Sequence, residues 1–439
     1  MKVLKFGGTS VGSAARIQHV AGLVKENGAQ IYVLSAMSGT TNSLVEIAGY
    51  LYNKNIDGVR DTVSTLAGKY KRTIDELYST EEYKSKAFTY VNEIFEYISS
   101  FSKQLFTQAE EKVILAQGEI ISTHLMTWYL QECGVNACLL DALEFMRLDL
   151  QGEPDQDYIA AHIKKTLAAC KGADAYITQG FICRNSQDGI DNLQRGGSDY
   201  SASLIGAAIG AEEIQIWTDI DGMHDNDPRI VKDTRPVRHL SFDEAAELAY
   251  FGAKILHPTC ILPAKYANIP VRLLNTMEPK APGTLIDNKT ERGAIKAVAA
   301  KDNITAIKIK SSRMLLAHGF LRKVFEIFES YKTSIDMICT SEVGVSVSID
   351  DTRHLGEIVH DLKRYGTVTV DLDMCIVCVV GDMDWENLGF ETKAMSAMKD
   401  IPVRMVSYGG SNYNISFLVK EEDKGAALKA LSDCLFSER

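Results

Sequence analysis

The sequence lacks any long hydrophobic run, and no segment approaches the roughly 20 apolar residues that a membrane-spanning helix needs. Its first residues, Met1 to Phe6, also lack the apolar core of a secretory signal peptide. These two absences argue against a membrane protein and an exported protein. The sequence therefore predicts a cytoplasmic protein without a membrane partner.

Positive charge is scarce as well. Lys and Arg number 47 against 58 Asp and Glu, which gives a net charge of -11. A nucleic-acid surface needs clustered cations that acidic residues do not balance, so this composition argues against a nucleic-acid partner. A local basic pocket remains compatible with it.

Cysteine is sparse, and its nine residues are scattered along the chain. Scattered cysteines fit reduced, mostly buried thiols. Cys375 and Cys378 form a CxxC pattern, but they lie in the apolar run from Met374 to Val380. A strand there would point the two side chains to opposite faces. We interpret them as core residues and not as a zinc or redox motif.

The length of 439 residues is enough for two or three domains, each with its own core. Up to about residue 290, short apolar β-type runs alternate with helical patterns. Near-continuous apolar strands between helices indicate a mostly parallel sheet covered on both faces, in which ligands gather at the carboxyl ends of the strands. The predicted strands are Val3 to Phe6, Ile31 to Ser35, Ala137 to Leu140, Ala175 to Thr178, Ile214 to Trp217 and Val271 to Leu274.

Residues 55–108 interrupt this alternation with two helical patterns, in which apolar residues recur at spacings of three and four. We interpret them as a helical insertion that covers the sheet or meets a partner. After Pro279 and Pro282-Gly283, residues 293–439 form shorter β-rich units in two similar cycles. Two βαββαβ-like units indicate a pair of small α+β regulatory domains.

The first candidate site is Lys5-Phe6-Gly7-Gly8-Thr9-Ser10, between a short apolar run and a helical pattern. Glycines let backbone N–H groups approach an anion closely, the following helix adds the positive end of its dipole, and lysine adds a full charge. The pattern is neither a Walker loop nor a GxGxxG fingerprint. Taken alone, it fits a phosphate site or an ordinary tight turn.

A second Gly pair precedes a helix in Arg195-Gly196-Gly197-Ser198-Asp199. Its alternative interpretation is an exposed loop with an Asp cap. Two such turns in one sheet domain favour a phosphate site more than one does.

Two further segments carry polar residues. Thr218 and Asp219 follow an apolar strand, where they suit a nucleotide's sugar or base, and Arg229 farther on suits its phosphates. By itself this segment fits a plain Asp-rich turn. Lys254, in Phe251-Gly252-Ala253-Lys254, is a second candidate cation for the phosphate chain, whereas His257 before a proline is interpreted as structural.

Together these motifs resemble those of an aspartate kinase of the amino-acid kinase superfamily. The matching stretches are KFGGTSVG, LSAMSGTTN, QGE at 117–119, RGGSDYSA, WTDIDG with DPR, and GAKILHP. The resemblance continues through residues 314–342, which are similar to the monofunctional, lysine-sensitive type with two ACT domains. It implies an amino-acid-kinase fold over residues 1–290, followed by two ferredoxin-like ACT domains, ACT1 at 303–373 and ACT2 built from 293–301 plus 374–439.

The resemblance implies that ATP, with Mg²⁺, phosphorylates the side-chain carboxylate of L-aspartate to give 4-phospho-L-aspartate. This is the first step of lysine, threonine and methionine biosynthesis. Lys5 and Asp199 would be catalytic, Lys5 as the phosphate-side charge and Asp199 as the group that orients it. ATP would be held by Lys5, Gly7, Gly8, Ser35, Thr218, Asp219, His224, Arg229 and Lys254, and the amino acid by Thr41, Glu119, Arg195 and Ser198. No residue is predicted to be a direct metal ligand.

Charge logic agrees with these roles. Arg195 can take an α-carboxylate in a bidentate pair, and Glu119 can take an ammonium. The nucleophile is a carboxylate that is already ionised at neutral pH, so no general base is needed. The difficulty is to bring one anion to another, which lysine and Mg²⁺ overcome by neutralising phosphate oxygens.

The regulatory half resembles the lysine site of lysine-inhibited enzymes, in which the effector lies at an ACT1 dimer interface. We therefore expect L-lysine to inhibit a homodimer formed through the ACT domains; whether dimers pair into tetramers is left open. Asp336 and Glu342 suit a cationic group, although isolated acids are more often solvated. The expected effector residues are Met314, Phe320, Leu321, Ile335, Asp336, Ser341 and Glu342.

The sequence departs from the family pattern at two positions. His224 stands where related enzymes commonly carry tyrosine beside the adenine, and Ala317 stands where a serine is often found. Two alternative functions stay open: another amino-acid kinase, of the glutamate or acetylglutamate type, and a catalytically silent ACT amino-acid sensor. The tandem small domains weigh against the first, and the intact Lys5, Glu119, Arg195, Asp199 and Lys254 against the second.

Overall fold

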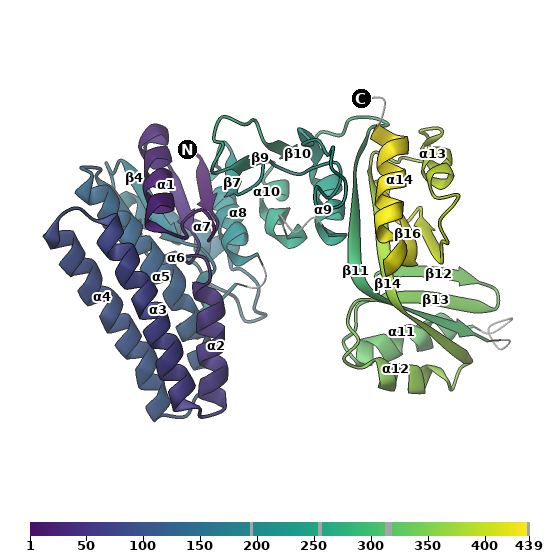
Figure 1. Ribbon diagram of the computed structural model, residues 1–439, viewed down its shortest axis with the longest axis horizontal. Helices are drawn as coiled ribbons and strands as arrows, with labels where there is room; N and C mark the ends of the chain where they lie inside the picture. Colours follow the sequence, from purple (N-terminus) through teal and green to yellow (C-terminus); the bar gives the residue numbers. More distant parts are fainter. Residues whose placement is uncertain (194–195, 253–256, 312–317, 437–439) are drawn as a thin grey trace. The chain divides into compact units, whose positions relative to one another are not determined.

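The computed structural model describes residues 1–193, 196–252, 257–311 and 318–436. The chain forms two compact units, Met1–Met223 with Ile255–Asn288, and His224–Lys254 with Lys289–Arg439. Each unit is built on its own β-sheet (Figure 1). In the described part of the chain, no helix combines the length and the apolar character needed to cross a membrane.

The sheet of the first unit has the strand order β3-β4-β2-β1-β7-β9-β10. All neighbours up to β9 run parallel, and only β10 is antiparallel to the strand beside it. The strands are β1 (Val3–Phe6), β2 (Ile31–Leu34), β3 (Ala137–Leu140), β4 (Ala175–Gln179), β7 (Ile214–Thr218), β9 (Val271–Asn275) and β10 (Thr284–Asp287). The predicted parallel sheet is confirmed, because every strand up to β9 lies where an apolar run predicts it.

The centre of this sheet explains the position of the site. β1 lies between β2 and β7, with Phe6 in register with Leu34 on one side and Trp217 on the other. The turns that leave these three strands therefore meet at one edge of the sheet, the carboxyl edge at which ligands gather in parallel sheets.

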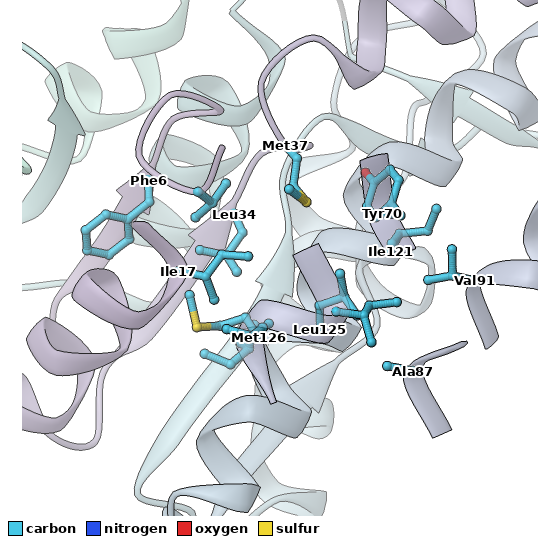
Figure 2. Packing of buried hydrophobic residues seen from close by; sticks show 14 of the residues in the cluster. Phe6, Ile17, Leu34, Met37, Tyr70, Ala87, Val91, Ile121, Leu125 and Met126 are labelled. Carbon is cyan, nitrogen blue, oxygen red and sulfur yellow. The ribbon is translucent and has the colours of Figure 1, made fainter. Parts of the chain in front are cut away.

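Helices cover the sheet and join it in one core (Figure 2). Phe6 and Leu34 of the sheet pack with Ile17 of α1 and with Leu125 and Met126 of α5. These apolar faces recur every three or four residues, which is why the segments fold as helices against a buried sheet. The helices are α1 (Ala14–Asn27), α2 (Thr40–Tyr52) and α5 (Gln108–Glu132).

The predicted insertion consists of α3 (Ile56–Leu77) and α4 (Glu81–Ser100), followed by the short helix η1 (Phe101–Lys103). Tyr70 of α3 is fully buried and packs 5.8 Å from Phe95 of α4, measured between ring centroids. Figure 2 shows Tyr70 beside Met37, in the segment that follows β2. The insertion is thus part of the main core of the first unit and not an appendage.

Short elements complete the first unit. β5 (Ile182–Arg184) and β6 (Ile190–Asn192) form an antiparallel hairpin. The remaining helices are α6 (Ala142–Phe145), α7 (Gln156–Ala169), α8 (Gly197–Ile209), η2 (Pro258–Ile261) and α10 (Leu262–Tyr266).

The second unit is organised around a six-stranded antiparallel sheet with the order β12-β13-β11-β14-β16-β15. Its two central strands are long, β11 (Ile295–Lys310) and β14 (Thr367–Gly381). The others are β12 (Met337–Ser341), β13 (Gly344–Ile349), β15 (Met405–Tyr408) and β16 (Asn414–Lys420). Short β8 (His239–Ser241) leads into α9 (Phe242–Tyr250) in the same unit.

The sequence predicts four separate β-runs where the structure has β11 and β14. The predicted runs are Ala294 to Ala300, Ile304 to Ile309, Val368 to Leu372 and Met374 to Val380. The register between them shifts on both sides of Ile304. Asn303 and Asp373 adopt left-handed backbone angles, with φ of 59° and 55°. Each strand therefore bends at this level without ending, and its two halves belong to different cores.

One core packs β13 and one half of β11 against α11 (Phe320–Ser330) and α12 (Leu355–Leu362). The other packs one half of β14 and β16 against α13 (Phe390–Ala397) and α14 (Lys424–Phe436), which the short helix η4 (Glu421–Asp423) precedes. The two predicted α+β cycles are thus two cores that share one sheet.

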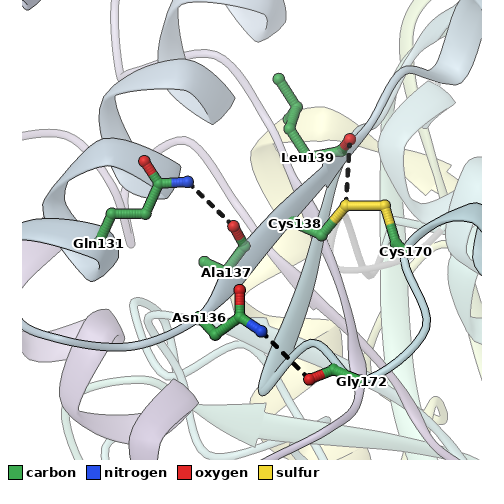
Figure 3. The surroundings of a disulfide bond; sticks show 7 residues. All are labelled: Gln131, Asn136, Ala137, Cys138, Leu139, Cys170 and Gly172. Carbon is green, nitrogen blue, oxygen red and sulfur yellow. Dashed lines mark hydrogen bonds between the residues drawn. A yellow bond between two sulfur atoms is a disulfide. The ribbon is translucent and has the colours of Figure 1, made fainter.

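Cysteine pairing departs from the prediction. Seven of the nine cysteines are free, including the buried Cys375 and Cys378, but Cys138 and Cys170 form a disulfide (Figure 3). The prediction of nine thiols rests on their separation along the chain. In the fold, the strand that follows α7 pairs with β3, so the end of α7 comes next to the start of β3, where Asn136 donates to the carbonyl oxygen of Gly172 (Figure 3).

Candidate active site

The glycine-rich turn connects β1 to α1 at the carboxyl edge of the sheet. Ser13 caps α1, so the turn itself spans residues 7–13. A Cβ on Gly8 would lie 2.8 Å from the carbonyl oxygen of Ala36, a contact that side chains do not make. Glycine at this position therefore lets the turn pack against the loop that follows β2, and the Ser38 N–H donates to the Gly8 carbonyl oxygen at 3.0 Å.

Lys5 lies on β1 just before this turn. Its ammonium nitrogen is 2.6 Å from Oδ1 of Asp199, and the two side chains are only 12% and 13% exposed. Asp199 is in the first turn of α8, whose N-cap Gly196 has a left-handed φ of 74°. The two Gly-rich motifs of the sequence therefore meet through an ion pair that is mostly shielded from water.

A cavity of about 780 Å³ opens beside this ion pair. It is lined by residues from the turn after β1, the loop after β2, α5, β6 and the start of α8. Among the residues with predicted site roles, it brings together Lys5, Gly8, Ser35, Thr41, Glu119, Ser198 and Asp199.

Ser198 approaches the turn after β4 at a glycine. A Cβ on Gly180 would lie 2.6 Å from both Cβ and Oγ of Ser198, so only glycine fits there without displacement. The Phe181 N–H donates to Oγ of Ser201 at 3.0 Å and fixes the same turn to α8. Ser198 and Asp199 are thereby held at the wall of the cavity.

Glu119 is a buried carboxylate on α5. A Cβ on Gly118 would lie 2.7 Å from Cβ of Ala36, so glycine lets α5 approach the loop after β2. Oε1 of Glu119 accepts the Ala36 N–H at 3.1 Å, and Oε2 is buried without a hydrogen-bond partner among the described residues. Burial raises the pKa of Glu119 to about 7, against the opposing effects of the Ala36 N–H and of Lys5.

The arrangement has the chemistry to hold an anion at one end and an ammonium group at the other. Lys5 and the backbone of the glycine-rich turn form the anion end. The unpaired oxygen of Glu119 is an acceptor in a desolvated place, where a charged donor binds strongly.

Comparisons with known proteins decide between families. A model described as the amino acid kinase family matches residues 1–275, and a model described as an ACT domain matches residues 377–435. Aspartokinase 1, chloroplastic, of Arabidopsis thaliana is 34% identical over 99% of this chain and 80% of its own length. Lysine-sensitive aspartokinase 3 of Escherichia coli is 32% identical over 99% of both chains.

The chain belongs to the aspartokinase family. Among solved structures, it resembles E. coli aspartokinase III in complex with aspartate and ADP, described as the R-state, with a TM-score of 0.85 and 30% identity over 99% of this chain and 100% of that one. It also resembles the same enzyme in complex with lysine and aspartate, described as the T-state, with a TM-score of 0.81 and 31% identity over 99% of each chain. The fold class and the family expected from the motifs are both confirmed.

The nucleotide residues expected from the aspartokinase motifs fall into three groups. Thr218 ends β7 beside β1 and Asp219 follows it, but neither residue lines the 780 Å³ cavity. His224 and Arg229 belong to the second unit, where Nδ1 of His224 lies 3.0 Å from Oγ1 of Thr234, and Arg229 forms a bidentate pair with Asp227. Lys254 lies outside the described residues, as does Arg195, which is expected to bind the amino acid and not the nucleotide.

The expected effector residues are all in the second unit. Phe320 is buried, Leu321 is partly exposed, and Ser341 and Glu342 are exposed at the end of β12. Met314 lies outside the described residues, as does Ala317. Ile335 packs at the edge of the core beneath α11, and the side chain of Asp336 is 1% exposed.

Several cavity residues carry no sequence signal for this role. Phe181 and Asn192 line the cavity from the segments around the β5–β6 hairpin. Lys112 pairs with Asp191 at 2.6 Å on the same wall. Their positions depend on how the β5–β6 hairpin packs on α5, which no local sequence pattern encodes. The only signal in the sequence is that polar residues occur in this short hairpin.

The raised pKa of Glu119 predicts a pH-dependent stability. Because the folded-state pKa of about 7 lies above the ordinary 4.5, stability from this group is full below pH 4.5 and is lost as pH rises through about 7. The glutamine in Glu119→Gln does not titrate, so it loses no stability in this pH range. Between about pH 5 and pH 8, the free energy of unfolding of Glu119→Gln minus that of the wild type should therefore increase by up to about 3 kcal/mol.

Urea unfolding of both proteins at the two pH values measures this difference. Glu111→Gln, which removes another carboxylate from the same cavity wall, is the matched control. A difference between Glu119→Gln and wild type that stays constant with pH would contradict the assignment.

Proposed function

We propose that this chain transfers the γ-phosphoryl group of ATP to the side-chain carboxylate of L-aspartate. The product is 4-phospho-L-aspartate, which enters the biosynthesis of lysine, threonine and methionine. The observation that carries the proposal is the shielded Lys5–Asp199 pair on one cavity with the buried, half-paired Glu119. The full-length similarity to aspartokinases, one of them solved with aspartate and ADP, supports the same substrates.

The reaction needs charge neutralisation more than proton transfer. Aspartate's side chain is ionised at neutral pH, so the nucleophile carries no proton to remove. Lys5 is the fixed cation that stabilises the transferring phosphoryl group, and Asp199 holds its ammonium in place from 2.6 Å. The backbone N–H of Gly8 and the Ser35 side chain add donors around the phosphates. The expected contribution of Gly7 is less direct, because its N–H donates to the Trp217 carbonyl oxygen at 3.3 Å.

The two substrates use different parts of the chain. For aspartate, Glu119 takes the ammonium and Arg195 the α-carboxylate, with Thr41 and Ser198 as polar neighbours. Since Glu119 must be ionised to bind an ammonium, aspartate binding lowers its raised pKa and is accompanied by proton release near pH 7. ATP is held by Thr218, Asp219, His224, Arg229 and Lys254.

Mg²⁺ is the expected metal of this reaction. It binds through one or two carboxylates together with substrate phosphates. In the described part of the chain, no group of three or more His, Cys, Asp or Glu side chains could hold the ion by itself, so the phosphates of ATP would supply its main ligands. When bound, Mg²⁺ would neutralise charge on the phosphate oxygens.

A hydroxamate assay tests the substrate assignment. With ATP-Mg²⁺ and hydroxylamine, the wild type should form hydroxamate from L-aspartate and not from L-glutamate, because the acyl phosphate forms only on the side chain that the cavity accepts. Product from glutamate alone, or no product from either amino acid with an intact fold, would contradict the proposal.

For the regulatory half, we propose ACT1 at 303–373 and ACT2 at 293–301 plus 374–439, following a catalytic region at 1–290. The two cores that share β11 and β14 support this division. L-Lysine inhibits a homodimer formed through these domains, as the similarity to a lysine-sensitive aspartokinase supports. The effector contacts are Met314, Phe320, Leu321, Ile335, Asp336, Ser341 and Glu342.

Asp336 already binds an internal cation. Its Oδ1 lies 2.7 Å from Nζ of Lys301 and accepts the hydroxyl of Tyr250 at 2.7 Å. Lys301 also pairs with Asp350 at 2.9 Å and lies 4.3 Å from the Tyr250 ring centroid. Oδ2 of Asp336 is buried without a hydrogen-bond partner among the described residues. An effector ammonium therefore either uses this second oxygen or competes with Lys301.

Asp336→Asn should raise the L-lysine concentration for half-inhibition at least tenfold, because a charge-assisted hydrogen bond contributes about 1.5–3 kcal/mol. Asp350→Asn is the matched control, since it also removes a carboxylate from Lys301 but is not an expected effector contact. L-Lysine and L-threonine are titrated separately against all three proteins. Inhibition of the wild type by threonine alone, or equal lysine sensitivity in Asp336→Asn, would overturn the effector assignment.

A further inference from the structure

The loop between β2 and α2, residues 35–39, is held from two sides. All five of its residues line the 780 Å³ cavity. On one side, the Ser38 N–H donates to the carbonyl oxygen of Gly8 in the glycine-rich turn. On the other side lies α3, the first helix of the insertion, which contributes the neighbouring residues Lys69 and Tyr70.

Lys69 binds the backbone of this loop. Its ammonium donates to the carbonyl oxygen of Ser38, and the Cβ position of Gly39 lies 3.8 Å from the same nitrogen. Burial lowers the pKa of Lys69. Among the described residues no carboxylate within 4.0 Å pairs with Lys69, so the loop carbonyl is the partner of its ammonium.

Tyr70 fixes the next point along the chain. Its hydroxyl lies 3.0 Å from Oγ1 of Thr40, and both side chains are fully buried. Burial raises the pKa of Tyr70, so the phenol stays neutral. Thr40 begins α2 and precedes Thr41, the expected aspartate contact.

Between these two points, Gly39 has a left-handed φ of 82° and no side-chain cap precedes α2. A loop that begins a helix without a cap is held by other groups or frays. The carbonyl of Ser38 and the hydroxyl of Thr40 are the groups that α3 holds, one on each side of Gly39.

We propose that Lys69 is a positioning residue for the amino-acid substrate. The proposal rests on the aspartate kinase function. Lys69 fixes Ser38 and Gly39, and through them the direction in which Thr41 and the first turn of α2 face the cavity. It acts on the aspartate end of the site, while phosphoryl transfer depends on Lys5 and Asp199.

Steady-state kinetics of Lys69→Met test this role. The KM for aspartate should rise at least fivefold, with kcat within about twofold of the wild type and the KM for ATP unchanged. Lys69→Arg, which keeps the charge and the donors, should restore most of the aspartate KM. Lys71→Met is the matched control, because this exposed lysine is also on α3 but forms no hydrogen bond or ion pair with the loop in the described part of the chain.

A second measurement does not depend on activity. Hydrogen–deuterium exchange without substrate should be faster across residues 35–42 in Lys69→Met and unchanged in Lys71→Met. An unchanged aspartate KM, or an equal rise in Lys71→Met, overturns the role of Lys69 in catalysis. If the wild type fails to phosphorylate aspartate, the proposed function is wrong. Exchange across residues 35–42 that is the same in Lys69→Met as in the wild type would independently refute the positioning role of Lys69.

Discussion

The ion pair between Lys5 and Asp199 is the interaction on which the site in the first unit depends. Lys5 comes from the central strand and Asp199 from the first turn of α8, and the pair is largely shielded from water. Removing two charges from water costs more than their attraction returns in many buried pairs, so stability alone does not account for it. In the proposed reaction Lys5 binds a phosphate, and before the phosphate binds, Asp199 is the counter-charge that keeps the lysine paired.

The glycines around the Lys5–Asp199 pair let neighbouring segments of the chain approach one another closely. Gly8, Gly118 and Gly180 each stand where a Cβ would meet a neighbouring segment at 2.8 Å or less. Through them the turn after β1, the helix α5 and the turn after β4 converge on one cavity. Glu119 and Ser198 reach the cavity wall because of these approaches, and Lys5 lines the same cavity.

The sequence predicts the elements that a local pattern encodes. Apolar runs predict the strands of the parallel sheet, and the Gly-rich motifs predict Lys5, Asp199 and Ser198. Lys69 could not be predicted, because its proposed role depends on a contact with Ser38, which lies 31 residues earlier in the chain. The pairing of Asp336 with Lys301 and the Cys138–Cys170 disulfide depend equally on segments that only the fold brings together.

In the second unit, too, the sequence does not predict which separate segments join, and its two long strands are an example. Local β-patterns predict each half of β11 and β14, but they do not reveal that the halves are continuous through Asn303 and Asp373. Continuity matters, because a strand shared by two cores links their packing. Lys301, beside the bend in β11, binds Asp336 and Asp350.

The most direct test of the account is a double-mutant cycle on Lys5 and Asp199, with kcat as the measured quantity. Lys5→Ala should lower kcat at least about a hundredfold, or roughly 2.7 kcal/mol, with a modest change in the KM for aspartate. Because Asp199 acts through Lys5, adding Asp199→Asn to Lys5→Ala should cost little more. A near-normal kcat in Lys5→Ala, or losses that add in the double variant, would contradict the account.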